Sequence, residues 1–267
     1  MTDTVNIPVA SVVAAAHALS LAGRWPLALD LLHASGSDDP RLLLAAAGVS
    51  VERDWFTGTS CAPDALAKVD GDGWDVGFLR LRDTYARQLR HPGTPTDASV
   101  LMHQDGCIKD DASEVLRQRA LALLEAAPDE TRRGWASMYL GLIADNVLGD
   151  RDAAPAHYTA ALAASGADPL LRREALRHLG DHDHDAGDHA LALERWRDAT
   201  AAGAAAGNVP GTLSQQLLLA VLARDTGDEA GAVALAAEVE RWSAAIGAVR
   251  TEAMARAFLD GVDPTKG

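Results

Sequence analysis

Apolar positions recur at helical spacing along most of the chain. Between residues 74 and 89, one stripe at this spacing carries Trp74, Phe78, Leu81, Tyr85 and Leu89, as expected for a helix with one buried face. Clear runs of Val, Ile, Thr and Tyr, which would indicate strands, are missing. Ala and Leu, which lose little free energy in a helix, are abundant instead. The pattern predicts an all-α fold.

Three Gly-Asp pairs divide the helical pattern into units. They stand at Gly149-Asp150, Gly187-Asp188 and Gly227-Asp228, which are 38 and 40 residues apart. Each pair follows an apolar helical segment and precedes an Ala-rich one. Glycine favours the end of one helix and a turn-forming Asp favours the start of the next. Each unit is therefore predicted to be a helical hairpin.

Small and large residues alternate around these turns in a repeated order. In the unit around Gly187, small Gly180 precedes the turn, and Ala192, bulky Trp196 and Ala199 follow it. Two closely packed helices need small residues at their crossing and a large one to fill the next gap. The counterparts in the other units are Gly141, Ala154, Tyr158 and Ala161, with one extra residue in the turn, then Ala220, Ala232, Ala236 and Val239, and near the N-terminus Ala16, Gly23, Ala28 and Leu32.

This order of residues resembles the tetratricopeptide repeat. The residues that match its motif are Leu179, Gly180, Gly187, Ala192, Trp196 and Ala199. Asp183 departs from it, because the motif usually has Tyr there, and the spacing exceeds the usual repeat of about 34 residues. The resemblance covers roughly residues 9–35 and 130–245, and the composition resembles that of actinobacterial tetratricopeptide proteins, which share no single activity. It implies a solenoid of helical hairpins that forms a right-handed superhelix with a concave groove.

The middle of the chain breaks this regularity. Residues 91–111 contain two prolines and two glycines without any period, which predicts a long loop or lid. We therefore expect degenerate N-terminal hairpins over 1–90, the loop over 91–111 and repeats over 112–267. Asp111 and Glu114 have the spacing of a capping box at the start of the next helix.

Composition excludes several classes of partner. The formal net charge is −14, which repels the phosphates of nucleic acids and anionic membranes. No run of 18 apolar residues could span a membrane, and the N-terminal region lacks the basic segment of a signal peptide. Cys61 and Cys107 have no metal-binding or C-x-x-C spacing. A cytoplasmic protein with reduced thiols is expected.

The segment ALRHLGDHDHDAGDH, residues 175–189, concentrates titratable side chains. His178 and His182 share a helical face at i and i+4, and H-x-x-D-H resembles an inverted zincin motif, with Asp in place of Glu. His178 with Asp181, or His182 with Asp185, could form the carboxylate-held histidine of a general base. The simpler interpretation is a solvated helix face, and it is favoured over a metal site. No serine or cysteine nucleophile motif lies nearby.

The resemblance also implies which side chains would line the groove. From the unit around Gly187 they are Arg177, His178, Asp181, His184 and Asp185; from the preceding unit Trp135, Met138, Tyr139, Leu142, Asp145 and Asn146; and from the following unit Ser214, Leu217, Leu218, Val221, Arg224 and Asp225. Such a groove suits a ligand with apolar bulk and a cationic or hydrogen-bonding group. Trp135 and Tyr139 could equally be core residues.

Two functions remain open at this point. The favoured hypothesis is a binding protein whose groove holds a peptide or a partner protein. The alternative is an enzyme or small-molecule binder on the same scaffold, with His178, Asp181, His182 and Asp185 as acid–base or metal groups and residues 91–111 as a lid. No cofactor and no metal are predicted, and self-association to a homodimer is left open.

Overall fold

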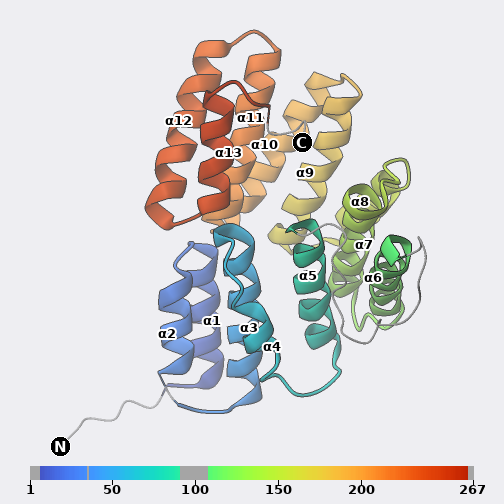
Figure 1. The fold of residues 1–267 in the computed structure, drawn as a ribbon, viewed down its shortest axis with the longest axis vertical. Helices are drawn as coiled ribbons and strands as arrows, with labels where there is room; N and C mark the ends of the chain where they lie inside the picture. The colour runs from blue at the N-terminus through green and yellow to red at the C-terminus, as the bar shows by residue number, and fades with distance from the viewer. Residues whose placement is uncertain (1–6, 35, 91–107, 264–267) are drawn as a thin grey trace, which may run out of the picture. The chain divides into compact units, whose positions relative to one another are not determined.

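The computed structural model describes residues 7–34, 36–90 and 108–263, and every regular element in these ranges is a helix (Figure 1). The all-α prediction is confirmed for this part of the chain. The elements are α1 (Val9–Leu21), α2 (Trp25–His33), α3 (Pro40–Thr57), α4 (Ala62–Leu66), α5 (Trp74–Arg90), α6 (Ile108–Glu125), α7 (Glu130–Ile143), η1 (Ala144–Leu148), α8 (Ala154–Ala164), α9 (Pro169–Asp185), α10 (His189–Ala205), α11 (Val209–Asp225), α12 (Glu229–Ile246) and α13 (Val249–Leu259). None of the described helices is both long enough and apolar enough to cross a bilayer.

The helices form two compact units. Unit 1 contains residues 1–71 and 206–267, and unit 2 contains residues 72–205. Helix α5, which the sequence analysis groups with the N-terminal hairpins, lies in unit 2. Helices α11 to α13 lie in unit 1 with the N-terminal helices. Most of the predicted 91–111 loop, residues 91–107, lies outside the described residues; α6 begins at Ile108, ahead of the predicted capping box at Asp111.

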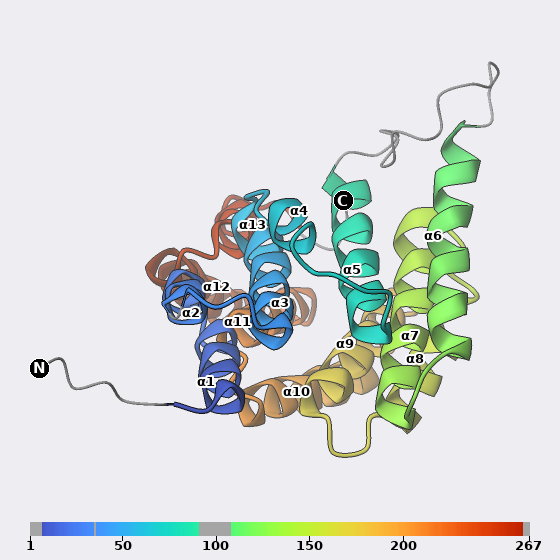
Figure 2. The same cartoon turned by 90° about the horizontal axis from the view of Figure 1, so that it is seen from below.

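Unit 2 consists of three successive helical pairs. They are α5 with α6, α7 and η1 with α8, and α9 with α10 (Figure 2). The second helix of each pair packs on the first helix of the next, α6 on α7 and α8 on α9. The first helices also meet, since α7 contacts α9 and α5 contacts η1. This order places side chains of α5, α7 and α9 within reach of one another.

The predicted pairing of small and large residues is confirmed in two of these hairpins. A Cβ added at Gly180 would stand 2.5 Å from Cδ1 of Trp196, and one added at Gly141 would stand 2.5 Å from Cε1 of Tyr158. Trp196 and Tyr158 are both fully buried. The aromatic ring of the second helix therefore occupies the space that the glycine of the first helix leaves free.

The extra residue of the α7–α8 hairpin lies in the helix and not in the turn, where the sequence analysis put it. Residues 144–148 form the π-helical segment η1, and the N–H of Asp150 donates to the carbonyl of Ala144 over 2.8 Å. A single widened turn absorbs one residue without disturbing the helices on either side. Gly149 then ends the helix in the left-handed region, at φ 71°, as Gly187 does at φ 81°.

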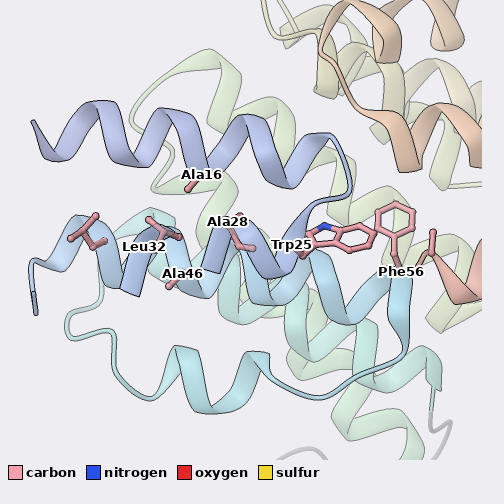
Figure 3. Packing of buried hydrophobic residues seen from close by; sticks show 9 residues of the cluster. Ala16, Trp25, Ala28, Leu32, Ala46 and Phe56 are labelled. Carbon is pink, nitrogen blue, oxygen red and sulfur yellow. The ribbon is translucent and has the colours of Figure 1, made fainter. Parts of the chain in front are cut away.

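Unit 1 has hairpins of the same kind, α1 with α2 and α11 with α12, together with α3, α4 and α13. Ala16 and Ala28 let α1 and α2 approach closely, and the rings of Trp25 and Phe56 stack at a centroid distance of 5.7 Å (Figure 3). Helix α3 begins at Pro40, whose fixed φ suits the first turn, and the carboxylate of Asp39 accepts from the N–H of Arg41.

Two segments far apart in the sequence build this unit. Helix α13 packs on α3, where the guanidinium of Arg250 lies 4.4 Å from the ring centroid of Trp55. The turn at Gly23 approaches the side chain of Ile246 near the end of α12. The hydrophobic core around Trp25 accordingly includes Ala248, from the turn between α12 and α13.

Candidate functional site

Helix α9 carries most of the candidate residues. Its N-terminus is capped by Asp168, whose carboxylate accepts from the N–H groups of Leu170 and Leu171. The helix continues to Asp185, so that residues three or four apart share a face. Gly180 allows close contact with α10 on one side of α9, while His178 and His182 reach Tyr158 of α8.

His178 is held on both ring nitrogens. Nη1 of Arg177 lies 2.9 Å from Nε2, and Nδ1 lies 3.4 Å from Oδ2 of Asp181. The same Nη1 also lies 3.4 Å from Nδ1, so the guanidinium of Arg177, which only donates hydrogen bonds, lies against both ring nitrogens. The ring also stacks on Tyr158 at 5.1 Å. Burial, followed by the charges of Arg177 and Arg173, lowers the pKa of His178 well below its ordinary value, which keeps the ring neutral.

Asp181 faces the interior of the α9–α10 hairpin. Its Oδ1 accepts from the indole N–H of Trp196 over 3.2 Å, and its Oδ2 lies 3.5 Å from Nη1 of Arg177. Burial raises the pKa of this carboxyl, against the opposing effect of the Arg177 charge. The predicted i, i+3 pair of His178 and Asp181 is thus present, but its atoms are occupied by residues that pack the hairpin.

His182 pairs with a carboxylate of the preceding hairpin. Its Nε2 lies 3.1 Å from Oδ2 of Asp145 in η1, and the hydroxyl of Tyr158 donates to the same oxygen over 3.1 Å. Nε of Arg151 lies 3.6 Å from Oδ1 of Asp145. Burial and the charge of Asp145 raise the pKa of Tyr158, so its phenol remains a donor. These four residues, Asp145, Arg151, Tyr158 and His182, are called the Asp145 cluster below.

His182 and Asp185 do not form the predicted pair. Nη2 of Arg151 lies 2.6 Å from Oδ2 of Asp185, whose side chain is 50% exposed. One arginine therefore bridges Asp145 and Asp185. The interpretation as a solvated helix face holds for Asp185 and is wrong for the histidines, since the side chains of His178 and His182 are 12% and 17% exposed.

His184 belongs to the packing of the hairpin. It is buried, stacks on His189 of α10 at 5.3 Å and contacts the ring of Trp196. Asp183, at the position where the repeat motif usually has Tyr, lies 2.8 Å from Nη1 of Arg195. An ion pair between α9 and α10 thus takes the place of the aromatic residue of the motif.

Trp135 and Tyr139 of α7 face α5. The ring of Phe78 lies 6.0 Å from that of Trp135 and 5.2 Å from that of Tyr139. The Tyr139 hydroxyl accepts from Nε of Arg82 over 3.2 Å, and both aromatic side chains are partly buried. Nδ2 of exposed Asn146 donates to the hydroxyl of Tyr85 over 2.9 Å. The structure brings these three predicted groove residues together along α5.

Two of the six predicted groove residues of unit 1, Leu217 and Arg224, have other contacts. Leu217 is 1% exposed and lies in a hydrophobic cluster with Val221 and Phe258. The guanidinium of Arg224 lies 3.6 Å from the ring centroid of Phe258, and its Nη2 lies 2.8 Å from Oε1 of Glu229. Leu217 is therefore a core residue, and Arg224 stabilises the end of α11.

Within the described ranges, no group of three or more His, Cys, Asp or Glu side chains is arranged to hold a metal ion. The contacts explain this result: His178 and His182 are directed to different carboxylates, and Asp185 binds Arg151. Sequence reasoning found most of the residues in this region but missed Arg151, for which the sequence offers no signal. The sequence predicts only a packing role for Tyr158. Its position in the hairpin is equivalent to that of Trp196 in the next one, and this placed it beside α9.

Comparison with known proteins adds no family assignment. A scan of the chain against protein-family models finds no match, and a search of curated proteins finds none either.

Proposed function

We propose that the chain is a tetratricopeptide-like binding protein, located in the cytoplasm, whose unit 2 recognises a peptide segment of a partner protein. The recognising surface would be the first-helix face, defined here by Trp135, Tyr139 and Asn146 of α7 and η1 and by Arg177 and His182 of α9. Successive helical hairpins present such surfaces along their first helices.

The observation that carries the proposal is the link between two hairpins at Asp145 and His182. This contact, 3.1 Å long, joins η1 to α9, so that polar side chains of both hairpins lie near each other. Aromatic rings and hydrogen-bonding groups alternate on this face, as they do at sites that bind apolar ligands with a few directed polar contacts.

Charge on this face favours hydrogen-bond recognition over attraction of a cation. Asp145, Asp181 and Asp185 each contact an arginine, so their negative charge is balanced locally. The sequence left a cationic and a hydrogen-bonding group of the ligand open, and these ion pairs favour the hydrogen-bonding group. We therefore expect peptides selected by this face to carry apolar and amide side chains, without an excess of Lys and Arg.

Selection from a phage-displayed library of linear peptides tests the proposal. Peptides that bind the full chain should lose at least about tenfold in affinity, about 1.4 kcal/mol, on Asn146→Ala. Gln118→Ala is the matched control, because Gln118 is an exposed amide on the second helix α6 of the same unit. Equal losses in both variants, or failure to select any binding peptide, would contradict the proposal.

One observation favours the alternative, an enzyme on the same scaffold. A histidine oriented by a carboxylate is the arrangement of a general base, and His182 has it. The other candidates do not add to it, since the atoms of His178 and Asp181 are engaged with Arg177 and Trp196. Peptide binding therefore remains the better supported proposal.

A further inference from the structure

The Asp145 cluster fixes the tautomer of His182. Oδ2 of Asp145 already accepts from the Tyr158 hydroxyl, and Oδ1 faces Arg151, so the carboxylate acts as an acceptor. Nε2 of His182, 3.1 Å from that Oδ2, is then the nitrogen that carries the proton. In the neutral ring, Nδ1 consequently bears the lone pair.

Nothing in the described part of the chain donates to this lone pair. The contacts of His182 there are with Asp145 and Tyr158, and neither supplies a proton to Nδ1. The side chain of His182 is 17% exposed, so part of its ring reaches the surface. His178, four residues earlier on the same helix, differs because both of its nitrogens are engaged.

The acceptor is held in a fixed direction before any ligand arrives. Asp145 is 9% exposed and receives the Tyr158 hydroxyl, while Arg151 is itself anchored on Asp185 at 2.6 Å. A preorganised acceptor loses little conformational entropy on binding, so its hydrogen bond contributes more to affinity.

We infer that Nδ1 of His182 is the acceptor that receives an N–H group of the bound peptide, a main-chain amide in particular. The inference rests on the proposed function, and it identifies the chemistry of one contact. An anionic group is disfavoured at this point, because the lone pair of Nδ1 and the Asp145 carboxylate both repel it. An N–H donor matches the lone pair and leaves the carboxylate in place.

Acylation by diethyl pyrocarbonate tests the accessibility of the lone pair without any peptide. The reagent transfers an ethoxycarbonyl group to an unprotonated imidazole nitrogen. We expect His182 to be modified several times faster than His178 in the folded full chain at pH 7.5, measured residue by residue by mass spectrometry. A rate at His182 equal to or below that at His178 would overturn the inference.

Binding is then measured with peptides from the phage selection. A bound peptide should slow the modification of His182 in the wild-type protein, a measurement that needs no variant. His182→Phe, which keeps a ring beside Tyr158 but removes the acceptor, should weaken binding about tenfold, whereas His189→Phe in α10 should not. A selected peptide could lose affinity on Asn146→Ala and yet neither protect His182 from acylation nor bind more weakly to His182→Phe. That result would overturn this inference and leave the proposed function standing. Failure to select any peptide would instead overturn the proposed function and with it this ligand, while the acylation rates would still report on Nδ1.

Discussion

The indole N–H of Trp135 donates to Oδ2 of Asp168 over 2.9 Å, while Oδ1 of the same carboxylate caps α9. One side chain thus ties α7 to the start of α9. Removing it leaves the indole N–H and two helix N–H groups without this acceptor, and each loss has its own cost.

Asp168→Ala should therefore lower the free energy of unfolding by about 1–2 kcal/mol or somewhat more, measured by urea denaturation. Asp228→Ala is the comparison, since Asp228 caps α12 through a single contact with the N–H of Gly231. It should cost less, about 1 kcal/mol. Equal costs would show that the Trp135 contact adds nothing.

Gly180→Ala should destabilise the protein even though alanine is the better helix former. The new methyl group would overlap the ring of buried Trp196, and overpacking of this kind costs about 1–3 kcal/mol. In Gly77→Ala the methyl group would stand 3.3 Å from the flexible end of Leu123, so the gain in helix propensity of up to about 1 kcal/mol should offset the contact. Thermal and urea unfolding of both variants measure the difference, and a stabilised Gly180→Ala protein would refute the packing described here.

Trp196→Ala should cost about 3–5 kcal/mol, because it empties a fully buried site between α9 and α10. Trp242 is the control of the same residue type: it is 50% exposed, and Trp242→Ala should change stability by no more than about 0.5 kcal/mol. Urea denaturation again provides the values. A loss near zero at Trp196 would place its ring outside the core.

Acidification should destabilise the fold through His178. Its pKa is near 6.5 in the unfolded chain and well below that when folded. The stabilisation is complete above about pH 6.5 and is lost as the pH falls from there toward the folded pKa, because the unfolded chain then binds the proton more readily. The contribution approaches about 1.4 kcal/mol per pH unit.

His178→Gln should flatten this part of the stability curve between pH 7.5 and 5. Asp181 acts in the opposite direction, since burial raises its folded pKa above 3.8 and proton uptake in that range favours the folded state. Urea unfolding of wild type and variant at several pH values gives the difference curve. Parallel curves would show that His178 titrates alike in the folded and unfolded chains.

The hairpins could be read from the sequence because their determinants are local. Gly187 ends a helix, and Gly180 and Trp196 lie seven and nine residues from it, so their pairing follows from helix geometry alone. The pair His178–Asp181 was predictable for the same reason. The position of the extra residue in η1 could not be predicted. The number of residues is the same whether the extra one lies in the turn between two helices or in a widened turn within the helix.

The partner of His182 could not be predicted from spacing. Asp145 and Asp185 both stood within the expected groove, and the choice between them depends on Arg151, which binds Asp185 at 2.6 Å and leaves His182 to Asp145. Likewise, Trp135 and Tyr139 were predicted as groove residues that could equally be core residues, and their contact with Phe78 depends on where α5 lies, which helix periodicity does not determine. Long-range competition between side chains and the course of irregular segments set these contacts.

Unit 1 joins residues 1–71 to residues 206–267, whereas unit 2 is one continuous stretch. During synthesis unit 2 leaves the ribosome before α11 to α13 do, so unit 2 can complete its core while α1 to α4 still lack the contacts that α12 and α13 supply. Contacts between such distant segments also slow folding, because the loop between them must close first. The N-terminal helices, although made first, are thus expected to be the last to reach their final packing and the most dependent on chaperones in the interval.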